Sequence, residues 1–144
     1  RKAQMARFGF TRIIYKSFFR IFRDWRHIEL SADTRIGEGL YIGHAYSITI
    51  NSRSIIGKNC NIHKGVLIGQ ENRGMRKGTP VIGDNVWIGI NSAIVGAVHI
   101  GNDVLIAPNS YVNCDVPNHS VVIGNPCVIK HRDNATEGYI NRTV

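Results

Sequence analysis

The chain has 144 residues, 43% of them hydrophobic, and a formal net charge of +8. This length suits one domain with a core of its own. Residues 1–26 hold eight Lys and Arg and one Asp, or 8 − 1 = +7, whereas the remainder holds ten bases and nine acids, or +1. A nucleic-acid-binding protein would spread its basic residues over a face of its body. The charge pattern therefore argues against nucleic acid as the partner of this chain.

The three cysteines show no spacing that predicts a disulfide framework or a zinc site, so we expect no metal. The missing pattern favours a reducing compartment, so we expect a cytoplasmic protein, with the inner membrane face as an alternative within the cytoplasm. Neither a secretory signal nor an apolar run of about eighteen residues is apparent. Cys60 is predicted to be a small buried hydrophobe.

The first predicted element is an amphipathic helix over residues 5–26, within a basic helical extension over residues 1–26. Its apolar stripe, at spacings of three and four, consists of Phe8, Thr11, Tyr15, Phe18, Phe22 and Trp25. Beside the stripe lie Arg12, Lys16, Arg20 and Arg23. Two interpretations stay open. The helix could dock on the end of the domain or on a neighbouring subunit, or it could lie on an anionic membrane surface.

Aliphatic residues recur every six positions in the next part of the chain, 27–130. The first run is Leu30, Ile36 and Ile42; the second is Ile50, Ile56, Ile62 and Ile68; the third is Ile82, Ile88, Ile94, Ile100, Ile106 and Val112. No helix or alternating strand has this period. A hexad repeat is typical of a parallel β-helix, in which three short flanks form each coil. The residue after each aliphatic, often Gly, is expected where the backbone turns and a side chain would crowd.

Two interruptions of the hexads mark features outside the regular wall. Two extra residues fall between Ile42 and Ile50, in the stretch 43–47, and predict a bulged corner. The polar segment 70–80 predicts an extruded loop, which could be functional or merely tolerated. The hexads end near Val116, 121–130 is predicted to be a last turn, and 131–144 to be a polar tail.

The repeat predicts which residues lie close to His44 in space. If Ile62 stacks on Ile42, then His63 and Lys64 lie above Gly43 and His44, and Glu29 lies below the same corner. A His with a carboxylate beneath it suits a general base, because the carboxylate favours the imidazolium that forms. The alternatives are a plain surface His44 and a structural His63. A rival mechanism would acylate Cys114 or Cys127, but the sequence shows no group that would activate either thiol.

These residues resemble the serine acetyltransferase family of left-handed β-helix acyltransferases, and still more its relatives in capsular and colanic-acid polysaccharide synthesis. The likeness rests on Ile28-Glu29-Leu30, Ile36-Gly37-Glu38-Gly39-Leu40, Gly43-His44-Ala45-Tyr46, Ile68-Gly69, Pro80-Val81-Ile82-Gly83 and Gly124-Asn125-Pro126. It implies an all-β, left-handed parallel β-helix, a homotrimer with acetyl-CoA bound between adjacent prisms, and direct transfer to a hydroxyl. By this resemblance His44 matches the catalytic His, and Glu29 matches its acidic partner.

The chain departs from the family at the serine contacts. The family's acidic partner is usually Asp, and Glu29 is longer by one methylene. An Arg-His-Pro run ends the family's loop, but Gly78-Thr79-Pro80 stands here, and Ser31 replaces another His. Thr79, His63 and Lys64 are the candidate acceptor contacts.

We therefore expect acetyl transfer to a sugar hydroxyl in surface polysaccharide synthesis. The alternatives are a serine O-acetyltransferase and a non-catalytic structural β-helix. Gly89 and Ala107 would let the arm of CoA approach the backbone closely. The resemblance adds Gly124, Asn125 and Pro126 as cofactor-binding residues. Lys130 would meet a CoA phosphate, unless it is simply solvated.

Overall fold

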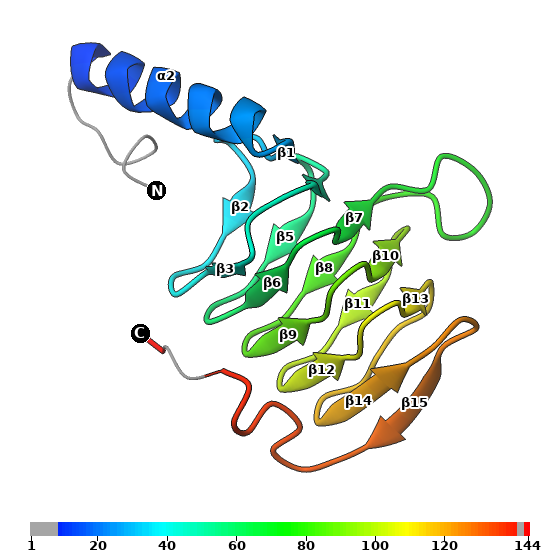
Figure 1. Ribbon diagram of the computed structural model, residues 1–144. Helices are drawn as coiled ribbons and strands as arrows, with labels where there is room; N and C mark the ends of the chain where they lie inside the picture. Colours follow the sequence, from blue (N-terminus) through cyan, green and yellow to red (C-terminus); the bar gives the residue numbers. More distant parts are fainter. Residues whose placement is uncertain (1–8, 141–142) are drawn as a thin grey trace.

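The computed structural model of the chain describes residues 9–140 and 143–144. Among these described residues, one helix, α2 (Gly9–Trp25), precedes fifteen short strands that wind into a three-sided prism (Figure 1). The strands of successive coils pair in parallel, so the predicted all-β, left-handed parallel β-helix is confirmed.

Each side of the prism is one sheet. The first sheet contains β1 (Ile28–Glu29), β4 (Ile48–Ile50), β7 (Leu67–Gly69), β10 (Ala93–Val95) and β13 (Tyr111–Val112). The second contains β2 (Arg35–Ile36), β5 (Ile55–Ile56), β8 (Val81–Ile82) and β11 (His99–Ile100). The third contains β3 (Tyr41–Gly43), β6 (Asn61–His63), β9 (Val86–Ile88), β12 (Val104–Ile106), β14 (Ser120–Ile123) and β15 (Val128–His131), and only β15 runs antiparallel to its neighbour.

The hexad aliphatics form the core of the prism. On the third sheet Ile42 pairs with Ile62, then Ile88, Ile106 and Val122 in successive coils. Paired strands lie about 4.8 Å apart, so each β-branched side chain packs on its counterpart in the next coil. Complete burial of one such side chain stabilises the fold by about 1.5–3 kcal/mol. Cys60 is buried among them, as predicted.

At the corners of the prism, close approach of two coils and the left-handed backbone turn fall on different residues. The sequence analysis expected glycine to meet both requirements. A Cβ on Gly37 would lie 2.6 Å from the backbone of Gly57, so this glycine permits close approach of coils. The left-handed turn itself falls on other residues, such as Asn59 and Asn85, whose φ angles are 54° and 55°. Asn tolerates this region better than most residues do, which corrects the expectation that glycine makes the turn.

Both predicted interruptions lie at corners. The extra residues between β3 and β4 form a corner in which His44 and Ser47 both have a φ of 52°. The loop over 70–80 leaves the prism after β7 and is bridged by Glu71 and Gly78. It returns to the wall where the amide of Ala97 donates a hydrogen bond to the carbonyl oxygen of Arg76, at 2.8 Å.

The helix α2 lies at the β1 end of the prism (Figure 1). Residues 5–8 of the predicted helix, including Phe8, lie outside the described residues. Phe19, which the predicted stripe omitted, packs against the core. Phe18, Phe22 and Trp25 are exposed. The stripe is therefore not buried against the chain's own prism, whereas docking on a neighbouring subunit and contact with a membrane both stay predictions.

The segment after β15 folds back along the prism and is tied down by Asp103. The Asp103 carboxylate accepts hydrogen bonds from the amides of Ala135 and Thr136, from the Thr136 hydroxyl at 2.7 Å, and from His119 Nδ1 at 2.8 Å. Farther along, the Asn61 amide nitrogen donates to the Tyr139 carbonyl oxygen at 3.1 Å. We call this segment, 135–140 together with 143–144, the C-terminal strap.

The strap's anchor depends on an ionised carboxylate. Burial raises the pKa of Asp103, but the hydrogen bonds from Thr136, His119 and Ala135 outweigh it and lower the pKa to about 2. A carboxyl whose pKa is lowered in the folded state stabilises the fold above its unfolded pKa of about 3.9. The anchor is thus complete at neutral pH, and its stabilisation is lost as the pH falls from about 4 towards 2.

We predict that Asp103→Asn loosens the strap at neutral pH. The amide cannot replace a charged acceptor of several hydrogen bonds, so the free energy of unfolding should fall by about 1–3 kcal/mol. Limited chymotrypsin digestion should then cut after Tyr139 faster than in the native chain, with thermal denaturation as the second measurement.

Asp133→Asn is the matched control, because Asp133 belongs to the same part of the chain and is exposed. It should leave both the cleavage rate and the melting temperature unchanged. Equal effects of the two substitutions would contradict the role given to Asp103.

Candidate active site

His44 and His63 lie together where the third sheet passes into the first. Gly43 pairs with His63 in the next coil, as the hexad register predicts. His44 follows Gly43 and projects from the corner, exposed, with its ring centroid 6.4 Å from that of His63. The absence of a side chain at Gly43 leaves room for the His63 ring, because a Cβ there would lie 2.5 Å from His63 Nδ1.

His63 is held in an aromatic setting. Its ring centroid lies 4.8 Å from Trp87 and 6.5 Å from Tyr41. Its Nε2 is buried and, among the described residues, has no hydrogen-bond partner. Burial lowers the pKa of His63, and the charge of nearby His44 lowers it further. His63 is therefore a neutral imidazole at neutral pH, with one ring nitrogen unused by the fold.

Glu29 occupies the register that the sequence predicts. It pairs with Thr49, which lies five residues after His44. Its side chain is exposed and lines a groove of about 1050 Å³ between α2 and β1, together with Ser31. In the described part of the chain, no hydrogen bond joins Glu29 to His44. The dyad stays a prediction.

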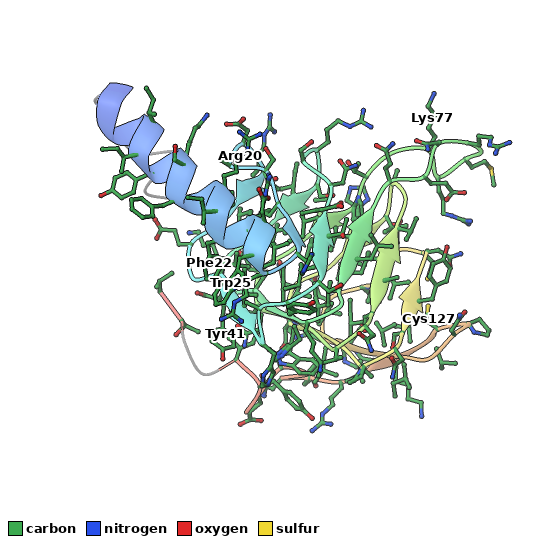
Figure 2. The ribbon with its side chains drawn as sticks, turned by 45° about the horizontal axis from the view of Figure 1, so that its top comes forward. Arg20, Phe22, Trp25, Tyr41, Lys77 and Cys127 are labelled. Carbon is green, nitrogen blue, oxygen red and sulfur yellow. The ribbon has the colours of Figure 1, made fainter. Side chains whose placement is uncertain are left out.

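The remaining acceptor candidates divide between two corners. Lys64 follows His63 and is exposed beside the histidine pair. Thr79 lies in the loop between the first and second sheets, where its hydroxyl donates to the carbonyl oxygen of Arg53 at 3.3 Å. Figure 2 shows Lys77 of this loop far from Tyr41 of β3. One prism therefore does not bring Thr79 to His44.

The predicted cofactor residues follow the histidine corner along the prism. The strand pairings place Gly89 one coil after His63 and Ala107 one coil after Gly89. Gly89 is closely covered, since a Cβ there would lie 2.6 Å from the backbone nitrogen of Pro108. These three positions therefore form one column beside His44.

The turn between β14 and β15 lies at the end of this column. Gly124 has a φ of 91°, and its amide donates a hydrogen bond to the Ser110 hydroxyl oxygen at 3.0 Å. Asn125 and Pro126 follow, exposed and joined by a cis peptide bond. Lys130 is exposed on β15, where it pairs with Val121 on the third sheet. It therefore lies on the sheet that ends in the histidine corner.

The cysteines do not support the rival mechanism. The sulfurs of Cys114 and Cys127 are 3.9 Å apart. Burial raises the pKa of Cys114, and its hydrogen bond with Cys127 raises it further. A raised pKa disfavours the thiolate that a nucleophile requires. Within 9–140 and 143–144, no group of three or more His, Cys, Asp or Glu could hold a metal ion.

The sequence analysis did not identify two aromatic residues at this corner. Trp87 lies one coil after Asn61, so the same register that placed His63 could have found it. Tyr139 lies 5.0 Å from Trp87, ring centroid to ring centroid. It reaches the site from the strap, whose path has no repeat in the sequence to reveal it.

The chain matches the family model of the bacterial transferase hexapeptide (six repeats) over residues 79–114. The serine acetyltransferase of Staphylococcus aureus (strain Mu50 / ATCC 700699) is 33% identical over 123 residues, which cover 85% of this chain and 58% of that protein. This is a hexapeptide-repeat chain that resembles serine acetyltransferases.

Solved structures support the same likeness. Soybean serine acetyltransferase superposes with a TM-score of 0.72 at 27% identity, covering 83% of this chain and 50% of that one. The Neisseria gonorrhoeae enzyme gives 0.64 at 32% identity, covering 74% and 42%. The chain thus spans about half the length of these relatives. Since the relatives named here are serine acetyltransferases, the expected closer likeness to polysaccharide enzymes stays a prediction.

We predict that Gly43→Ala displaces the His63 ring from its buried position. The added methyl group would overlap the imidazole, and the ring would move towards solvent. Because burial lowers the pKa of His63, release should raise that pKa towards its ordinary value. An NMR titration of the His63 ring protons measures the change.

Gly69→Ala is the matched control, because its new Cβ would meet only the Leu67 side chain, at 3.5 Å. It should leave the His63 titration unchanged. A His63 pKa that stays the same in Gly43→Ala would show that the corner does not hold the ring as described.

Proposed function

We propose that this chain belongs to an acetyl-CoA-dependent O-acetyltransferase. The observation that supports it best is the pair of His44 and His63 at a projecting corner of a β-helix similar to serine acetyltransferases. His44 is exposed to an incoming acceptor, while the buried side of His63 faces Trp87. A coil corner of this kind presents a base on a rigid frame.

In the proposed reaction His44 takes the proton of the acceptor hydroxyl as its oxygen attacks the thioester carbonyl carbon. Backbone N–H groups near the corner would stabilise the negative charge on the carbonyl oxygen. The carbon–sulfur bond then breaks, and the CoA sulfur leaves with the proton that His44 gained. The products are an acetyl ester and free CoA. Glu29 would favour the protonated His44 if it approaches the ring in the assembled enzyme.

We take L-serine as the first candidate acceptor. The relatives that share most of this chain's length are named serine acetyltransferases, and one solved relative is described as complexed with serine. This replaces a sugar hydroxyl as our leading expectation. His63, with its unused ring nitrogen, and Lys64 are the acceptor contacts that this chain would supply beside His44.

A sugar hydroxyl in polysaccharide synthesis remains the second candidate. It is favoured by Thr79 and Ser31, which stand where the family has serine-contacting histidines. Ser31 lines the groove under α2, and that groove of about 1050 Å³ is larger than free serine requires.

We further propose that the enzyme is a homotrimer located in the cytoplasm. The separation of Thr79 from His44 supports a site shared between adjacent prisms, because the loop at one corner can only complete the histidine corner of a neighbour. CoA would lie along the column of Gly89 and Ala107, with Gly124, Asn125 and Pro126 at its end. Lys130 would meet a CoA phosphate. The spacing of the three cysteines, which predicts no disulfide framework, suits a reducing compartment.

We predict that His44→Ala lowers turnover by roughly 10²–10⁴ while the affinity for CoA stays nearly the same. The loss removes the base but leaves the column of small residues intact. Steady-state kinetics with acetyl-CoA and calorimetric titration with CoA are the two measurements.

His99→Ala is the control, since His99 is exposed on the second sheet, away from the corner. Its turnover should match that of the native protein. Full turnover in His44→Ala would remove His44 from the mechanism, and failure of the native chain to bind CoA would favour a purely structural β-helix.

We predict that free L-serine saturates the enzyme in the millimolar range or below. A panel of nucleotide sugars and oligosaccharides should give slower acetyl transfer, measured by release of the CoA thiol. Saturation by one of the sugars, with no transfer to serine, would reject serine and support the second candidate.

A further inference from the structure

The helix α2 is turned so that its apolar side faces away from the prism. Phe18, Ile21 and Trp25 are 70%, 68% and 69% exposed. At 100° per residue these three positions lie on one face, together with Ile14 and Phe22. The helix is therefore strongly amphipathic, yet its apolar face is not used in the chain's own core.

The opposite side of α2 faces the prism. Phe19 contacts the core, and Lys16, Arg20 and Arg23 line the groove above β1. Figure 2 shows Arg20 on one side of the helix and Phe22 and Trp25 on the other. An amphipathic helix packed on a core normally has the reverse orientation, with its apolar side inward. A contiguous exposed apolar face of this kind marks an interaction surface.

Charge indicates what covers this face. Residues 1–26 carry +7, and the rest of the chain carries +1. A second copy of the helix would bring the same positive charge against it, so a contact between two such helices is opposed. An anionic surface is attracted instead. Arg26 adds a cation at the edge of the apolar face, with its guanidinium carbon 4.7 Å from the Trp25 ring centroid and 5.7 Å from that of Phe22.

The composition of the face fits a lipid interface. Tryptophan, phenylalanine and tyrosine side chains suit the boundary between head groups and acyl chains, and basic residues on the polar side attract anionic lipids. Among the described residues, no helix, α2 included, is long and apolar enough to cross a bilayer. A helix of this type lies in the plane of the surface.

We propose that α2 binds an anionic lipid surface, with Phe18, Ile21 and Trp25 inserted among the head groups and the prism held beside it. This goes beyond the proposed acetyl transfer and does not depend on it. If the protein is a trimer, several copies of α2 on one side would strengthen the binding through effective concentration.

The test is co-sedimentation of the full chain with two kinds of vesicle. One is pure phosphatidylcholine, and the other contains phosphatidylglycerol as about a third of its lipid. We expect binding to the anionic vesicles that weakens when the salt rises from about 0.05 to about 0.5 M. Little binding to the neutral vesicles is expected. Equal binding to both, with no response to salt, would overturn the proposal.

Phe18→Gln and Trp25→Gln separate insertion from simple charge attraction. Each side chain is mostly exposed, so the fold should tolerate the change, which circular dichroism verifies. The partition coefficient should fall about ten- to a hundredfold for each variant. Met75→Gln is the matched control, because Met75 is a fully exposed apolar residue of the loop over 70–80. It should bind like the native chain.

A different outcome would show that the apolar face of α2 contacts a second copy of the chain. If the native chain ignores both vesicles, and Phe18→Gln changes its oligomeric state by light scattering, the face is an interface between subunits and the lipid proposal is wrong. If neither vesicle binding nor oligomeric state responds to these substitutions, the proposal is also wrong.

Discussion

Every coil of the prism depends on an aliphatic side chain that lies directly on its counterpart in the next coil. Ile62 on Ile42 and Ile88 on Ile62 repeat this contact, while backbone hydrogen bonds run between the same strands. The stack accepts only one residue at each inward position, so the period of the sequence must be kept along the whole wall. Additional residues are expelled at corners, and both departures from the period, at 43–47 and at 70–80, lie there.

The corners therefore hold the residues that are free to do chemistry. The stacked wall sets the distance between His44 and His63, and it places Gly89 and Ala107 on the same column. The same rigidity keeps the loop with Thr79 at another corner of the prism. A site that needs both corners cannot be completed by bending one prism, because its interior is closely packed. This is the reason for proposing a site shared between adjacent prisms.

Much of this arrangement could be predicted because a repeat converts position in the sequence into position in space. The register of Ile62 on Ile42, and of His63 beside Gly43, follows from counting six residues at a time. The helix was predictable from its period, but its orientation was not, because amphipathicity defines two sides without saying which side meets the prism. The exposure of Trp25 and the inward position of Phe19 came only from the structure.

Contacts that do not follow the six-residue repeat could not be predicted from the sequence. The hydrogen bonds of Asp103 with the strap join residues more than thirty positions apart, and no local pattern announces them. The register does not give the distance between Glu29 and His44 either, since that distance depends on how the bulged corner folds. Register gives neighbours along a column, whereas the direction of a side chain at a bulge depends on backbone angles such as the φ of 52° at His44.

The C-terminal strap changes how the coils can come apart. In a solenoid each coil contacts only its neighbours, and separate parts can open independently. Here Asp103 of a late coil holds the strap, and the strap reaches back to early coils, where Asn61 binds Tyr139 and Asn59 binds the amide of Val144. Coils distant in the stack are thereby linked into one loop of contacts. Opening an early coil must therefore disturb a late one, so this short solenoid should unfold as a unit and not fray from its ends.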